Sequence, residues 1–185
     1  MRSSPRYPAR IVLTTSDTHF GDFQHNMGMV PAPTWRDPRS LAKPGTADNA
    51  PSATGGRTAY STSKLAVIYL AHTLARRLPT GVEIYAFNPG LVPGTGPVRD
   101  SGPVTRFLFR AIMPMMTLTP FARTITTSGH DLAAAATAPL AAATGSYLNG
   151  TKVERSSAQS YDRGREDALW DELTRLAATP PVARP

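Results

Sequence analysis

Short apolar runs alternate along the chain with longer segments in which apolar residues recur at helical spacing. The run at 11–13 is β-branched and apolar, as is typical of a buried parallel strand, and the run at 82–87 has the same character. The predicted strands are 10–16, 81–87 and 145–149, and the predicted helices are 57–78, 120–136 and 165–177. This alternation predicts an α/β fold with a parallel sheet, a partial Rossmann-like (doubly wound) arrangement.

Segments rich in polar residues, proline and glycine separate these elements. Residues 1–9 are predicted to form a flexible lead-in, 17–56 a long loop and 179–185 a flexible tail, so that one domain spans 10–178. No apolar stretch follows Met1, so we expect no signal peptide. No run approaches the ~20 apolar residues of a membrane span.

Residues 103–118 form an apolar, methionine-rich segment interrupted by proline. The pattern leaves open a substrate lid, a core helix or a membrane-surface helix. Thr119 and Pro120 follow as the predicted N-cap and first residue of the helix at 120–136.

The composition narrows the classes of function. The formal net charge is +7, but the 20 lysines and arginines are scattered without interleaved aromatic residues, which predicts an arginine-rich surface and no nucleic-acid binding. The absence of cysteine excludes disulfides and thiolate metal sites, and it fits a cytoplasmic protein. His19 and His25 lie in the long loop without a ligand cluster, so we expect no metal.

The first chemical motif is a tyrosine and a lysine four residues apart, Tyr60 and Lys64, at the start of the helix predicted at 57–78. Positions i and i+4 share one helix face, so the ammonium stands near the phenol and favours the phenolate. This makes Tyr60 a candidate general acid or base. The alternative is a solvated helix lysine beside a packing tyrosine.

Two further motifs end predicted strands. Ser16 ends the strand at 10–16, and Asn88-Pro89-Gly90 ends the strand at 81–87. Ligands of open α/β sheets bind at the carboxyl ends of strands, and a glycine there lets the backbone approach a ligand closely. The alternative is that Ser16 or Asp17 caps a turn.

These three motifs, in this order, resemble the short-chain dehydrogenase/reductase family, most closely its protochlorophyllide reductase-like and retinol dehydrogenase-like branch. The resemblance covers about residues 10–177. It implies that Tyr60 exchanges a proton with the substrate oxygen, that Lys64 supports the phenolate and holds the nicotinamide ribose, and that Ser16 orients the substrate carbonyl. The interval from Ser16 to Tyr60 is longer than in most members, which leaves open whether the two side chains meet.

The resemblance also implies NAD or NADP as cofactor. Its nicotinamide would face the backbone of Pro89, Gly90 and Val92, and Tyr60 and Lys64 would contact its ribose. The family's usual carboxamide-binding threonine is replaced by Gly94, so that role passes to Thr95.

The chain departs from the family at its start. It lacks the glycine-rich βαβ unit that holds the cofactor pyrophosphate, and the helix asparagine of many members, so it resembles a C-terminal portion of the fold. The strand at 11–13 then becomes a sheet edge, and the helix at 57–78 has apolar residues beyond one sheet face. We therefore expect marginal stability, with self-association or a complementing N-terminal half at that edge or that helix.

Two functions follow. The first is hydride transfer between NAD(P) and a small carbonyl or alcohol substrate. An apolar substrate is inferred from Trp35, Phe107, Phe109 and the methionines. The second is a non-catalytic remnant or oligomerisation module without cofactor binding.

Overall fold

A computed structural model describes residues 9–43, 52–92 and 122–178. Its centre is one sheet of four strands in the order β1-β2-β3-β4, with the first three parallel and β4 antiparallel to β3. The strands are β1 (Ala9–Thr14), β2 (Val82–Asn88), β3 (Tyr147–Asn149) and β4 (Lys152–Glu154). The longer helices are α3 (Ala53–Arg77), α5 (Ile125–Thr137) and α6 (Arg163–Ala178). The α/β prediction with three parallel strands is confirmed.

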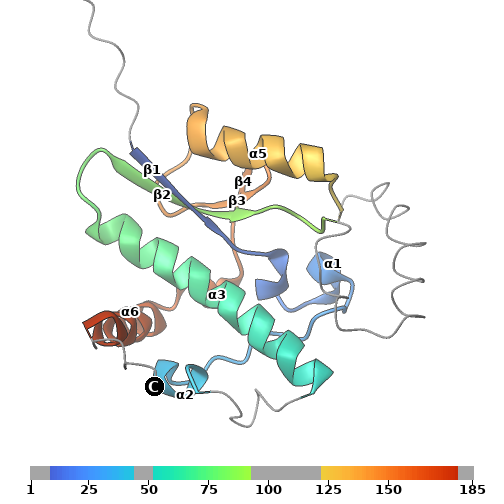
Figure 1. Cartoon of the computed structure of the whole chain (residues 1–185), viewed down its shortest axis with the longest axis vertical. Helices are drawn as coiled ribbons and strands as arrows, with labels where there is room; N and C mark the ends of the chain where they lie inside the picture. The colour runs from blue at the N-terminus through green and yellow to red at the C-terminus, as the bar shows by residue number, and fades with distance from the viewer. Residues whose placement is uncertain (1–8, 44–51, 93–121, 179–185) are drawn as a thin grey trace, which may run out of the picture.

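Strand β2 is buried on both faces from Ile84 onward, which explains its apolar run at 84–87. Ile84 and Ala86 pack on one face with Ile68 of α3. Tyr85 and Phe87 pack on the other face in the cluster that contains Ala135 of α5. Figure 1 shows α3 and α5 on opposite sides of the sheet, so the layers are α5, sheet and α3.

Helix α3 is 25 residues long and begins four residues before the predicted start. Ser52 caps it, because its hydroxyl accepts the Gly55 N–H at 2.9 Å. Arg76 and Arg77 lie in the last turn, where they complement the helix dipole.

The outer side of α3 is covered, contrary to the expectation that it would be left open. Helix α6 and the short helix α2 (Pro38–Leu41) lie on the side of α3 away from the sheet (Figure 1). Tyr69, fully buried, meets the ring of Trp35 at 4.7 Å and donates to Gln159 O at 2.8 Å. The extra apolar residues of α3 therefore serve a third layer formed by this same chain.

Several element boundaries differ from the predictions. Strand β1 ends at Thr14 instead of residue 16, because Ser16 caps the 3-10 helix η1 (Asp17–His19). The third strand starts at Tyr147. Strand β4 forms a hairpin with it that was not predicted, because a single valine between Lys152 and Glu154 gives no apolar run. Helix α5 is capped by Thr124. Thr119 and Pro120 lie outside the described residues.

The predicted loop at 17–56 contains short helices: η1, α1 (Phe23–Asn26), α2 and the first turn of α3. Strand β1 is an edge of the sheet among the described residues, as expected. The segment 103–118 lies outside them. Among the described helices, none combines the length and the apolar character needed to cross a membrane.

Candidate functional site

Helix α3 holds Tyr60 and Lys64 beside the carboxyl end of β1. Thr15, just past the strand, donates its hydroxyl to Lys64 O at 2.8 Å, and Lys64 Nζ donates to Thr14 O at 3.4 Å. The ammonium lies 5.3 Å from the centre of the Tyr60 ring. Burial lowers the pKa of Lys64. The tyrosine is 47% exposed, so its hydroxyl is accessible to a ligand.

Ser16 adopts the alternative role that its sequence left open, as a capping residue. Its hydroxyl accepts the Thr18 N–H at 3.3 Å and donates to Asp17 Oδ1 at 3.2 Å. Among the described residues there is no hydrogen bond between Ser16 and Tyr60. The two candidate groups nevertheless lie on neighbouring elements, because η1 contacts α3.

The buried side chain of His19 links the backbone of Ser16 to that of Ser157. The side chain is fully buried, and Nδ1 lies 2.6 Å from Ser16 O while Nε2 accepts the Ser157 N–H at 3.1 Å. These partners require a neutral ring that is protonated at Nδ1. Burial lowers the pKa of His19 to about 4, which agrees with that state.

A pocket of about 200 Å³ opens at the carboxyl ends of the three parallel strands. We call it the strand-end pocket, and its lining residues are Asp17, Phe20, Gln24, His25, Gly90, Arg123, Tyr147 and Asn149. Asp17 follows β1, Gly90 follows β2 and Asn149 ends β3. The pocket thus lies where ligands of open α/β sheets bind.

Arg123 joins the ends of β2 and β3 at this pocket. Its Nη1 donates to Asn88 O at 3.2 Å and its Nη2 to Asn149 Oδ1 at 2.8 Å. A Cβ on Gly90 would lie 3.0 Å from Arg123 Nη1, and one on Gly150 2.9 Å from Arg123 Cζ. Both glycines have positive φ angles, 75° and 63°. Gly90 therefore makes room for Arg123. Its expected role in admitting a ligand stays a prediction.

One group of the strand-end pocket lacks a hydrogen-bond partner in the described part of the chain, and a second is a partly buried carboxyl. Tyr147 is 2% exposed, and its hydroxyl has no hydrogen-bond partner among the described residues. Asn88 lies near that hydroxyl but donates to Asn149 Oδ1 at 3.3 Å. Burial raises the pKa of Tyr147. Burial also raises the pKa of Asp17, although the hydrogen bond from the Ser16 hydroxyl and the charge of Arg123 act to lower it.

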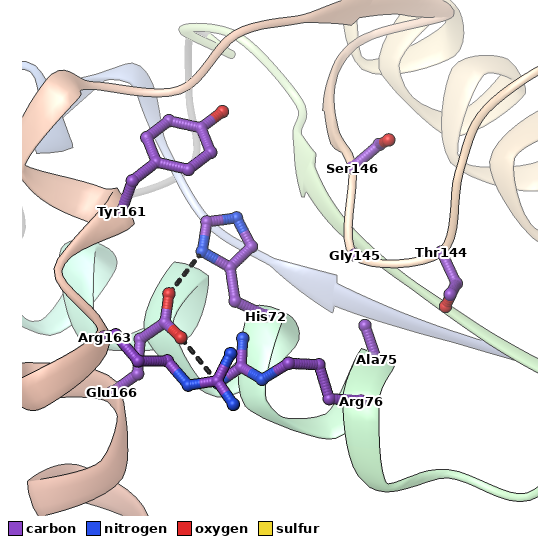
Figure 2. Close-up of a pocket in the computed structure, with 9 residues that line it drawn as sticks. All are labelled: His72, Ala75, Arg76, Thr144, Gly145, Ser146, Tyr161, Arg163 and Glu166. Carbon is purple, nitrogen blue, oxygen red and sulfur yellow. Dashed lines mark hydrogen bonds and ion pairs between the residues drawn. The ribbon is translucent and has the colours of Figure 1, made fainter.

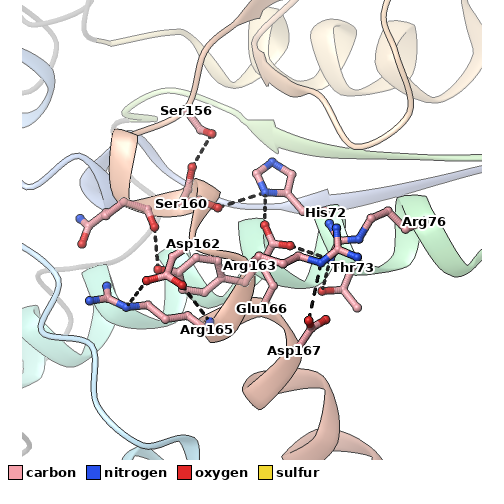
Figure 3. A network of polar contacts seen from close by, with 12 residues as sticks. His72, Thr73, Arg76, Ser156, Ser160, Asp162, Arg163, Arg165, Glu166 and Asp167 are labelled. Atoms are coloured by element: carbon pink, nitrogen blue, oxygen red, sulfur yellow. Dashed lines mark hydrogen bonds and ion pairs between the residues drawn. The ribbon is translucent and has the colours of Figure 1, made fainter.

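A second pocket, of about 500 Å³, lies between α3 and α6 (Figure 2). Three polar residues of its lining, His72, Arg76 and Glu166, form with the neighbouring Ser160 what we call the α3–α6 cluster. Glu166 is 4% exposed, with Oε1 3.0 Å from His72 Nδ1 and Oε2 2.6 Å from Arg76 Nη2. The latter contact is an ion pair without hydrogen-bond geometry. His72 Nδ1 also lies 3.1 Å from Ser160 O, and Figure 3 shows these contacts linking α3 to the start of α6.

The sequence thus predicted the Tyr60–Lys64 pair and the strand-end location, and it missed most of the pocket lining. Asn149 could have been found, because it ends a predicted parallel strand. Tyr147 reads as a core residue, and Arg123 carries no sequence signal. Pro89 and Gly90 follow β2 as expected; Thr95 lies outside the described residues.

The described residues place a phenol and an ammonium side by side, with Lys64 Nζ 5.3 Å from the centre of the Tyr60 ring. Tyr60 and Lys64 present a phenol and an ammonium suited to ribose hydroxyls. No described strand leads through a glycine-rich turn into a helix N-terminus, the arrangement that holds a pyrophosphate. Within these ranges there is also no group of three or more histidine or carboxylate side chains placed to hold a metal ion.

Comparison with known proteins adds no relative. No protein-family model matches the chain, and a search of curated proteins finds no match.

Proposed function

We propose that the chain is the substrate-side portion of an oxidoreductase of the short-chain dehydrogenase/reductase type, which moves a hydride between NAD or NADP and a small carbonyl or alcohol substrate. The observation that carries this proposal is the placement of Lys64. Its ammonium lies 5.3 Å from the Tyr60 ring centre and within 3.4 Å of the last carbonyl of β1. A cation, a phenol and a strand carboxyl end together suit proton transfer beside a ligand.

Each side chain has a defined part in the proposal. Tyr60 gives a proton to the substrate oxygen during reduction and takes one during oxidation. Lys64 stabilises the phenolate electrostatically and hydrogen-bonds the nicotinamide ribose. Ser16 turns its hydroxyl from Asp17 to the substrate oxygen. The bound nicotinamide supplies or accepts the hydride.

The pyrophosphate end of the cofactor needs a partner in this proposal. Strand β1 is an edge among the described strands, and its outer backbone groups can pair with an added strand. We propose that a glycine-rich βαβ unit, or a second copy of this chain, pairs there. With the outer side of α3 covered, the edge is the better of the two surfaces expected for association.

A second candidate is a non-catalytic remnant or oligomerisation module. The observation that favours it is the lack of a pyrophosphate cradle among the described residues. In that case Tyr60 and Lys64 remain by descent and bind no cofactor.

Titration with NADH and NADPH, followed by nicotinamide fluorescence, separates the two candidates. The oxidoreductase proposal predicts saturable binding, weakened in Lys64→Met and unchanged in the matched control Lys152→Met on exposed β4. No binding at millimolar cofactor would favour the remnant.

For the complete enzyme, Tyr60→Phe is expected to abolish turnover while leaving cofactor affinity nearly unchanged. Tyr161→Phe, equally exposed at 47%, is the control and should keep full activity. Turnover retained in Tyr60→Phe refutes the role of Tyr60.

A further inference from the structure

The hydroxyl of Tyr147 is the starting point, because a buried polar group without a partner is rare. The side chain is 2% exposed, and its hydroxyl makes no hydrogen bond within the described residues. Leaving such a group unsatisfied costs about 1–3 kcal/mol. Because Tyr147 lines the strand-end pocket, a ligand there could restore the missing bond.

The other pocket groups indicate what such a ligand must offer. Asn149 is already occupied, since its oxygen accepts from Arg123 and its amide donates to Glu154 Oε2 at 3.0 Å. Asp17 carries a carboxyl whose Oδ1 accepts from Ser16. A ligand group that accepts from Tyr147 and donates to Asp17 satisfies both, and a hydroxyl does both.

The walls and charge of the pocket narrow the ligand further. Phe20 and His25 stack with ring centres 3.6 Å apart and planes within 6°, which gives one flat side. The positive charge of Arg123 stands against the negative charges of Asp17 and of Asp131, whose Oδ2 lies 3.8 Å from Arg123 Nε. Nearby charges of both signs favour a neutral ligand. A volume of about 200 Å³ suits a small ring.

We propose that the strand-end pocket binds a hydroxyl-bearing part of the substrate, so that the substrate is a small neutral diol or hydroxyketone. This inference rests on the proposed function. One hydroxyl or carbonyl reacts at Tyr60, and a second hydroxyl is bound between Tyr147 and Asp17. Ser16 lies beside the pocket, because its hydroxyl lies 3.2 Å from Asp17 Oδ1.

The proposal revises the expectation of an apolar substrate. Trp35, one basis of that expectation, packs against Tyr69 on the outer side of α3. Phe107 and Phe109 lie outside the described residues.

The test is binding of cis-cyclohexane-1,2-diol to the full chain, observed by NMR with tyrosine labelled at ¹³Cζ. Cyclohexanol is the matched probe, because it lacks only the second hydroxyl. The diol should shift the Tyr147 signal saturably and bind about tenfold more tightly than cyclohexanol, the value of about one hydrogen bond. Tyr147→Phe assigns the signal.

Two variants test the assigned contacts. Because Tyr147→Phe removes the Tyr147 signal, the affinities of the variants are measured from the signals of the other tyrosines and from the line widths of the ligand. Tyr147→Phe and Asp17→Ala should each lower the affinity for the diol to about the affinity for cyclohexanol, whereas Tyr161→Phe should not. Equal binding of the two probes overturns the proposal, and so does an unchanged preference for the diol in Tyr147→Phe. The absence of a saturable shift at diol concentrations up to about 0.1 M overturns it as well.

The same experiment separates this inference from the proposed function, since it needs neither cofactor nor turnover. Diol binding without any NADH or NADPH binding leaves the pocket assignment standing and removes the oxidoreductase proposal. Cofactor binding without diol preference does the reverse.

Discussion

The two polar regions of this molecule are built in opposite ways. In the α3–α6 cluster, the buried carboxylate of Glu166 contacts the imidazole of His72 and pairs with Arg76, both on the neighbouring helix (Figure 3). In the strand-end pocket, the buried hydroxyl of Tyr147 meets no partner among the described residues. The cluster has the larger cavity, about 500 Å³ against about 200 Å³.

Cavity size alone does not identify the better candidate site in this molecule. A buried charge whose partners are in place holds two elements together and gains little from a ligand. A buried polar group without a partner is a local cost that a ligand can remove. The smaller pocket, at the carboxyl ends of parallel strands, is therefore the better candidate site.

The largest expected effect comes from breaking the α3–α6 cluster. Glu166→Ala should lower the free energy of unfolding by about 3–4 kcal/mol, because it leaves His72 and Arg76 partly buried without their anion. Urea unfolding followed by tryptophan fluorescence measures the loss. The control is Asp167→Ala, whose contacts are long, 3.6 and 4.0 Å, and whose side chain is 48% exposed. Equal losses in the two variants would remove the structural role of the cluster.

The next effect concerns pH and His19. Because burial lowers the pKa of His19 from 6.5 to about 4, the unfolded state binds more protons in this range. The contribution of His19 is thus present above pH 6.5 and is lost as the pH falls towards 4, about 3 kcal/mol in total.

Urea unfolding at several pH values checks this expectation. The wild-type chain should lose stability between pH 6.5 and 4, and His19→Gln should show a much flatter profile over that range. Burial raises the pKa of Asp17, so this residue changes the pH dependence of stability in the opposite sense. Asp17 is present in both chains, and the difference between their profiles therefore gives the contribution of the His19 imidazole. His130→Gln, exposed on α5, is the control and should keep the wild-type slope. Parallel profiles for wild type and His19→Gln would contradict the assignment.

The smallest change in stability is expected for Tyr147→Phe, in the strand-end pocket. Tyr147→Phe removes a hydroxyl that has no partner among the described residues, so stability should stay within about 1 kcal/mol of wild type or rise. Thermal and urea unfolding of this variant give the value. A loss comparable to that of Glu166→Ala would mean that the hydroxyl is satisfied in the folded chain.

The sequence predicted the elements whose signal is local. The apolar runs at 11–13 and 82–87 and the periodicity of 57–78 gave strands and helices within a few residues of those observed. The boundary at Ser16 was missed because a serine after a strand is equally suited to cap a turn, and here it caps η1.

The strand-end pocket was less predictable because it is assembled from distant segments. Asp17, Gly90, Arg123 and Tyr147 come from four separate parts of the chain. The backbone N–H of Arg123 donates to Leu91 O at 2.9 Å, which holds Arg123 beside the end of β2. No local sequence pattern predicts this contact. The covering of α3 by α6 likewise depends on pairs such as His72 with Glu166, which are 94 residues apart.

Saturation-transfer NMR of NADH and NADPH with the full chain tests our proposal that Tyr60 and Lys64 form the nicotinamide end of a cofactor site. We expect the strongest transfer at the nicotinamide and its ribose protons and weak transfer at the adenine. The signal should be lost in Lys64→Met but not in Lys152→Met. Transfer dominated by the adenine and unchanged in Lys64→Met, or no transfer at millimolar cofactor, would contradict the claim.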